Sequence, residues 1–138
     1  MKISFPFFLL ILLGGCVSPS SEQVSAGKLE MNETRPFLDI PLPRGLEHYS
    51  REGFLRLRDR TAILLYRGNV SWARLHEFFD YYLPVSNWRR IRMIQVGGEE
   101  RIVYRKDEEH LVLVVRPPSK GGGIEVVMEL NIYNERTR

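Results

Sequence analysis

The spacing of apolar residues after residue 45 constrains the fold of this chain more than any other feature. Between residues 71 and 83 apolar side chains recur every three or four positions, as on one face of a helix. Later segments carry them at alternate positions, as in half-buried strands. One helical stripe and one sheet face must bury each other, so we expect an α+β fold, a two-layer sandwich.

The helix is expected over residues 71–83. Ser71 is a natural N-cap, and Val70 and Leu75 are spaced to form a hydrophobic staple. Pro84 disfavours helical backbone at the residue before it, so the helix should end at Leu83. The apolar stripe consists of Trp72, Leu75, Phe78, Phe79, Tyr82 and Leu83.

Strands are expected on both sides of this helix. The segments 53–58 and 61–67 should form a hairpin about Asp59 and Arg60. The segment 88–96 has an irregular alternation, which indicates a β-bulge. Short turns join it to the segments 101–106, 110–116 and 124–132, so the last four strands should form an antiparallel meander. The predicted order is β-β-α-β-β-β-β.

The N-terminal residues have the pattern of an export signal. Lys2 precedes an apolar run from Phe5 to Leu13, which is shorter than the about 20 residues that span a bilayer. Cys16 is the only cysteine, and it follows two glycines. An ordinary secretory signal with an incidental cysteine remains an alternative at this point.

The four residues Leu13-Gly14-Gly15-Cys16 resemble the lipobox of bacterial lipoproteins. The resemblance implies that residues 1–15 are removed and that Cys16 becomes an acylated N-terminus, so that the protein is anchored to a membrane of the cell envelope and faces the periplasm. No thiol then remains for a disulfide, for catalysis or for a metal. Val17 stands where an aspartate would otherwise favour retention, a pattern that resembles outer-membrane sorting in enteric-type bacteria.

Residues 16–44 are expected to form a flexible tether, and residues 45–138 a single domain. Polar residues dominate most of the tether, and such a composition buries too little apolar surface to fold. The stretch 36–43 differs, because prolines alternate with large apolar residues. It is either an extended arm on the domain's own surface or a docking segment for a partner.

The part of the domain from Thr61 to Ile132 resembles helix-grip modules and other small, uncharacterised α+β domains of envelope lipoproteins. The features that carry this resemblance are an aromatic-rich helix and the pair Asn87-Trp88 at the start of the next strand. Those domains have glycine where this chain has Asn87. The resemblance implies no catalytic residues.

Motifs for known catalytic or metal chemistry are lacking. Neither a Gly-x-Ser-x-Gly nor a His-Glu-x-x-His sequence occurs, and the glycines 121–123 precede a strand rather than a helix. His76 and Asp80 lie one helical turn apart, and they are either a metal-binding or catalytic pair or simply a solvated histidine beside a carboxylate. We expect no cofactor, metal or catalytic residue, although an enzyme of unrecognised type remains an alternative.

Arginines gather on the first two strands after the helix, where cross-strand neighbours lie within reach of one another. The chain as a whole is near neutrality, with 20 Lys and Arg against 17 Asp and Glu. Glu125 and Glu129, with Glu99 and Glu100, could neutralise the arginines in a ladder of ion pairs. The alternative is a patch for anionic lipid headgroups or an acidic partner. The cluster is Arg89, Arg90, Arg92, Arg101 and Arg105.

These features predict a lipoprotein with a non-catalytic interaction or assembly domain. Its expected partners are the membrane, through Cys16, and an envelope protein, whereas nucleic acid is not expected outside the cytoplasm. A carrier that holds a small ligand in a cleft between helix and sheet is the alternative. Filling of that cleft by Phe78, Phe79, Tyr82 and Met128 would count against the carrier.

Overall fold

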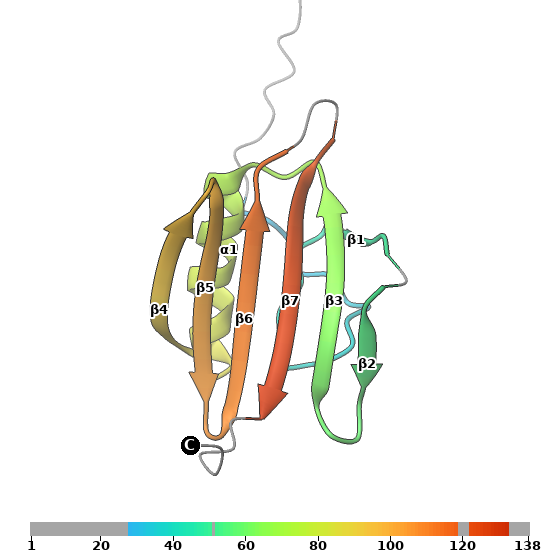
Figure 1. The fold of residues 1–138 in the computed structure, drawn as a ribbon, viewed down its shortest axis with the longest axis vertical. Coiled ribbons are helices and arrows are strands. Elements are labelled where there is room, and N and C mark those ends of the chain that lie inside the picture. The colour runs from blue at the N-terminus through green and yellow to red at the C-terminus, as the bar shows by residue number, and fades with distance from the viewer. Residues whose placement is uncertain (1–27, 51, 119–121, 133–138) are drawn as a thin grey trace, which may run out of the picture.

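The computed structural model describes residues 28–50, 52–118 and 122–132, and within them one helix packs on a seven-stranded antiparallel sheet (Figure 1). The coarse prediction of an α+β fold is confirmed. The elements are β1 (Glu47–His48), β2 (Phe54–Arg56), β3 (Thr61–Gly68), α1 (Trp72–Val85), β4 (Arg89–Val96), β5 (Glu99–Lys106), β6 (Glu109–Arg116) and β7 (Ile124–Ile132).

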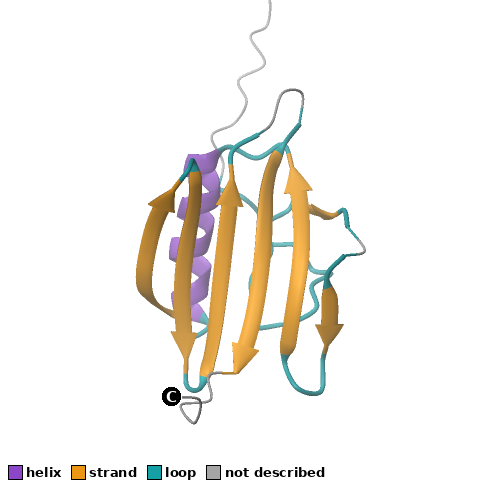
Figure 2. Ribbon diagram, viewed as in Figure 1, coloured by secondary structure: helices purple, strands orange, loops and turns teal. Residues whose placement is uncertain are grey.

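The sheet has the strand order β1-β3-β7-β6-β5-β4, and β2 also pairs with β3 (Figure 2). The meander of β4 to β7 is confirmed by the antiparallel registers of its three strand pairs. The short β1 was not expected, because two residues carry no alternation that could be recognised. β3 lies between β7 and the short strands β1 and β2, so α1 carries the chain from near one edge of the sheet to β4 at the opposite edge.

Helix α1 begins as expected but ends two residues later than predicted. The Ser71 side chain accepts a hydrogen bond from the backbone N–H of Arg74. Pro84 lies inside the last turn, and the helix is ended by Asn87, whose φ is 66°. The N–H groups of Asn87 and Trp88 donate to the carbonyls of Pro84 and Leu83, the pattern of a Schellman cap.

The predicted β-bulge is present in β4, where the register shifts between Arg90 and Arg92. The extra residue is Ile91. The turn to β5 consists of Gly97 and Gly98, with φ of 59° and 84°, the backbone of a type I′ hairpin. Because the bulge adds one residue, the side chains of Arg90 and Arg92 point to opposite faces of the sheet.

The space between α1 and the sheet is filled. Leu75, Phe78, Phe79 and Leu83 of the helix are buried, and Met128 of β7 is buried in the same core. Buried side chains therefore occupy the space in which the alternative, a small-ligand carrier, would hold its ligand. Helix α1 covers only the part of the sheet toward β4, β5 and β6 (Figure 1).

Residues 28–46 cover the rest of this sheet face, which corrects the expected domain boundary. Phe37, Ile40, Leu42 and Leu46 are between 1% and 4% exposed and belong to the same core as the helix. The domain therefore begins well before residue 45, and the expected sandwich has a second layer made of a helix and an extended segment. Of the expected tether, residues 16–27 lie outside the described residues.

Candidate functional site

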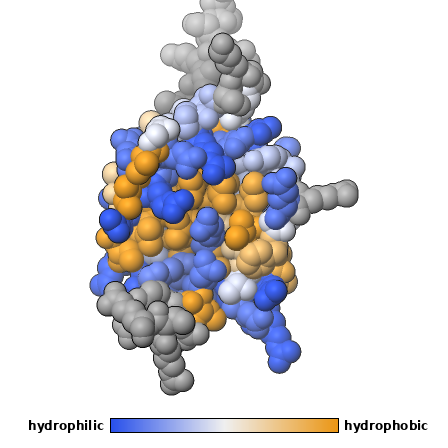
Figure 3. All heavy atoms as spheres, viewed as in Figure 1, coloured by the Kyte–Doolittle hydropathy of each residue, from blue (hydrophilic) through white to orange (hydrophobic). Residues whose placement is uncertain are grey.

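The sheet face opposite α1, here called the open face, carries no second layer within the described part of the chain. Apolar and charged side chains are interleaved over it (Figure 3). Val114 and Val127 are only 2% and 8% exposed, although no helix or strand of the described residues lies over them. Their cross-strand neighbours on this face are each other, Arg101 and Leu65. The open face is therefore neither a simple polar surface nor a bare apolar one.

Four of the five predicted arginines lie together on the open face, at the edge formed by β4 and β5. Arg89 is the cross-strand partner of Arg105, and Ile94 is the partner of Arg101. Arg92 lies opposite Val103, between the two arginines of β5. All four are exposed. We call Arg89, Arg92, Arg101 and Arg105 the arginine cluster.

Arg90 is separated from this cluster by the bulge. It lies opposite Tyr104 on the helix side of the sheet. There its Nη1 donates to Asp80 Oδ1 of α1 at 2.8 Å. The structure therefore brings together four of the five arginines and assigns the fifth to the contact between β4 and the helix.

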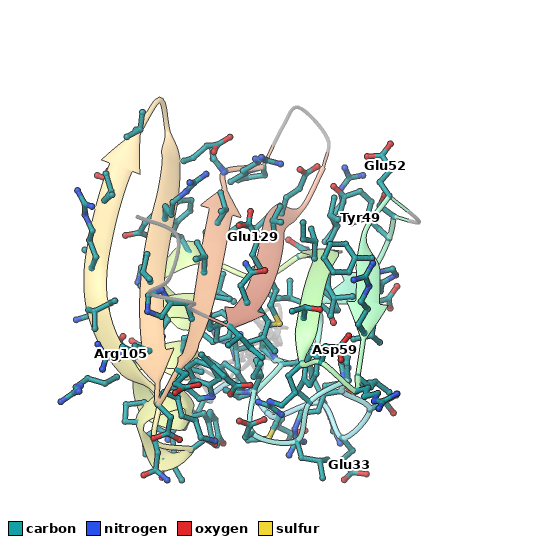
Figure 4. All side chains as sticks on the ribbon, turned by 60° about the horizontal axis from the view of Figure 1, so that its bottom comes forward. Glu33, Tyr49, Glu52, Asp59, Arg105 and Glu129 are labelled. Atoms are coloured by element: carbon teal, nitrogen blue, oxygen red, sulfur yellow. The ribbon has the colours of Figure 1, made fainter. Side chains whose placement is uncertain are left out.

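Of the four carboxylates that could neutralise the arginines, three pair with other residues, and Glu129 lies on β7, two strands away from β5. Glu125 pairs with Arg67, and Glu99 pairs with Arg116 at 2.8 Å. Among the described residues no carboxylate forms an ion pair with the arginine cluster; the Nε of Arg105 donates to the backbone carbonyl of Asp107 instead. Figure 4 shows Arg105 extending away from β5, with Glu129 on β7 beyond the intervening β6.

A second polar group lies between α1 and β5. Nε2 of His76 is 2.5 Å from Oε2 of Glu100, and the His76 ring stacks on Trp72 with centroids 5.9 Å apart. Glu100 is 3% exposed and is the one charged residue that is buried among the described residues. His76 and Asp80, which the sequence left as either a functional pair or a solvated histidine beside a carboxylate, bind Glu100 and Arg90 respectively.

Tyr104 lies next to this group on the helix side of β5. Its hydroxyl is buried and has no hydrogen-bond partner in the described residues. Burial, together with the negative charge of Asp80, raises the pKa of Tyr104 to about 12, so the phenol stays neutral at physiological pH. Within the described residues no three His, Cys, Asp or Glu side chains are placed to hold a metal ion.

Asp39 joins the N-terminal segment to the sheet. Its carboxylate accepts from Arg60 at 2.9 Å and from Lys106 at 2.7 Å, and its backbone carbonyl accepts from Nε1 of Trp88. Burial by itself would raise the pKa of Asp39, but the hydrogen bonds from Lys106 and Arg60 outweigh it and the pKa is lowered. This network fixes the segment in place.

A groove opens between the N-terminal segment and the short strands β1 and β2. Its volume is about 920 Å³, and Leu64 and Tyr66 of β3 contribute to its lining. Leu42 and Leu46 line it from the N-terminal segment, and Phe54 lines it from β2. The groove was not predicted from the sequence, because one of its walls belongs to residues 28–46, most of which were expected to form the tether.

The chain matches no protein-family model, no curated protein and no solved structure with which it was compared. None of the helices in the described residues is long and apolar enough to cross a membrane. Cys16 and the apolar run before it lie outside those residues.

Proposed function

We propose that this chain is a lipid-anchored protein of the bacterial cell envelope and that its domain is a non-catalytic interaction module for an acidic protein. The observation that carries the proposal is the arginine cluster. Four exposed guanidinium groups share one edge of the open face, and no carboxylate of the described chain pairs with them.

The chemistry of the cluster supports an acidic partner. Guanidinium groups bind carboxylates through two parallel hydrogen bonds, so arginines select planar anions by geometry as well as by charge. Like charges held side by side repel each other, and an incoming anionic surface relieves that repulsion. Complementary charge also speeds the encounter and fixes the orientation of the two partners.

Anchoring through Cys16 would hold the domain close to its membrane. Because the folded region includes residues 28–46, only the residues between Cys16 and Lys28 are left to act as the tether. At about 3.3–3.6 Å per residue, this tether lets the domain lie no more than about 40 Å from the membrane anchor. Partners for the domain would therefore be other proteins at the same membrane surface.

The anchor is tested by replacing Cys16 with serine and following acylation, mass and membrane fractionation in cells. We expect the variant to lack acyl chains and to keep its signal or leave the membrane, since stable anchoring takes more than one acyl chain. A matched control carries Cys16→Ser together with Ser18→Cys and should behave in the same way. Unchanged mass and fractionation of the first variant would refute the anchor.

The interaction site is tested by chemical crosslinking in cells that carry R89E, R92E, R101E and R105E together. A control reverses Arg56 and Arg58, two exposed arginines of the β2–β3 hairpin. We expect the crosslinked adducts of the wild-type chain to disappear only when the arginine cluster is reversed. Identical adducts in all three proteins would refute the site. Adducts to lipid alone would show that the cluster binds anionic headgroups and not a protein.

A second candidate function is the binding of a small apolar ligand, and the groove beside β2 favours it. Its volume lies in the range of small-molecule sites, and its lining is mostly apolar. Native mass spectrometry of the protein purified from its host tests this candidate. A bound apolar molecule that is lost in a Leu64→Trp variant would support it, and a mass equal to that of the protein alone would count against it.

A further inference from the structure

The strand that carries half of the arginine cluster is also a free edge of the sheet. β4 ends the strand order, and among the described residues nothing pairs with its outer side. It is eight residues long, whereas the opposite edge is covered by the short strands β1 and β2. The bulge at Ile91 interrupts this edge, and the part from Arg92 to Val96 offers a row of backbone donors and acceptors to another strand.

The hairpin geometry identifies the backbone groups that point outward. In a two-residue hairpin the residues that flank the turn, Val96 and Glu99, form a hydrogen-bonded pair. Hydrogen-bonded and non-hydrogen-bonded pairs alternate along an antiparallel ladder. The N–H and C=O groups of Met93 and Gln95 therefore point away from β5 and are available to a partner.

Edge strands that are protected against pairing usually carry charged side chains or proline, whereas β4 also exposes apolar side chains. Ile91, Met93 and Val96 are 49%, 55% and 70% exposed, which leaves apolar surface along this edge. Arg89 and Arg92 project from the same strand onto the open face. A strand added to β4 would place alternate side chains beside these arginines.

We infer that β4 binds an extended acidic segment of a partner protein, which adds to the sheet as an antiparallel or parallel strand. This inference rests on the proposed function and names how that site works: the backbone edge supplies hydrogen bonds, and the arginine cluster selects carboxylates. A second copy of this chain is a poorer occupant, since its own arginines would lie along the same seam.

The test uses the purified full chain and a synthetic peptide, eight residues long like β4, that alternates glutamate and valine. Binding is followed by fluorescence anisotropy, and hydrogen exchange is followed at the amides of Met93 and Gln95. Gln95→Pro removes one outward N–H without touching the β4–β5 ladder, and Gln95→Ala is its control. We expect binding to protect both amides and to weaken by about tenfold, or 1.4 kcal/mol, in Gln95→Pro.

The outcomes separate this inference from the proposed function. Equal binding to Gln95→Pro and Gln95→Ala, with loss of binding on reversal of Arg89 and Arg92, would overturn strand addition and leave the acidic partner in place. Binding that survives the arginine reversal would overturn both. No binding of the peptide, or self-association of the chain without peptide in sedimentation, would also overturn strand addition.

Discussion

Asp39 is the residue on which the N-terminal segment depends most. Its side chain is 23% exposed and receives hydrogen bonds from two cations, while its backbone carbonyl receives one from Trp88. Because the net pKa of Asp39 is lowered on folding, its ionised form stabilises the native state at pH values above the unfolded pKa near 3.8. That contribution is lost as the pH falls through the folded pKa.

Asp39→Asn should therefore lower the stability near neutral pH and flatten its acid dependence. Hydrogen bonds to charged groups contribute about 1.5–3 kcal/mol, and we expect a loss in that range at pH 7. Urea unfolding from pH 7 to pH 2 measures both effects. A variant that keeps the full acid dependence of the wild type below pH 4 would show that another carboxylate is responsible.

Asn87 is the second residue whose backbone decides local structure. Its φ of 66° lies in the left-handed region, where glycine is unstrained and most L residues are not. We expect Asn87→Ala to lose about 1 kcal/mol of unfolding free energy and Asn87→Gly to lose none. Ser86→Ala, with an ordinary φ of −94°, is the control for thermal unfolding. Equal losses in both Asn87 variants would contradict the cap.

At the scale of elements, the segment 28–46 acts as part of the second layer rather than as a linker. It crosses β3 at Gly68, where an added Cβ would lie 1.7 Å from the carbonyl oxygen of Gly45. Such a clash cannot be relieved by moving a side chain, because the atom in the way belongs to the backbone. The segment can therefore pack against the end of β3 only if residue 68 has no Cβ atom.

Gly68→Ala should displace this segment and expose it to protease. Overpacking costs about 1–3 kcal/mol, and native-state trypsin digestion should show faster cleavage after Arg44, since the bond after Arg35 leads to Pro36 and resists trypsin. Leu38→Ala, at a side chain that is 79% exposed in the same segment, is the control and should leave the rate unchanged. Cleavage of the wild type at the rate of Gly68→Ala would mean that the segment is not docked.

The contact of α1 with β5 depends on the pair His76 and Glu100. His76→Phe should cost about 1–3 kcal/mol, since it leaves the buried carboxylate without its partner. Replacing both residues, with Phe and Leu, should recover most of that loss, and urea unfolding of the two variants measures the difference. A double variant less stable than His76→Phe alone would show that Glu100 has another role.

The elements that the sequence predicted correctly are those with a local signal. The hydrophobic stripe and Ser71 predicted the start of α1, and the alternation in 124–132 predicted β7 within its observed bounds. The N-terminal segment was missed because its average composition is polar, although four apolar residues held by prolines suffice to join the core. The burial of Glu100 beside His76 was not predicted, because its strand was expected to begin at Arg101.

At the scale of the whole molecule, the two faces of the sheet differ in kind. One is sealed by α1 and the N-terminal segment, and on the other, buried valines lie among charged side chains with no layer formed above them by the described residues. A single bulge places Arg90 on the helix side and the arginine cluster on the open face. The sequence predicted a bulge in this strand but did not show that Ile91 is the extra residue. The open face is therefore the surface on which a partner is expected.

The most direct test of this account is site-specific photocrosslinking in the native host from Val103, which lies within the arginine cluster on the open face. Ile63, on the same face but on β3, is the matched control position. The account predicts a discrete protein adduct from Val103 that is absent from Ile63 and lost when the arginine cluster is reversed to glutamate. The same adducts from both positions, or an adduct that survives the reversal, would contradict it.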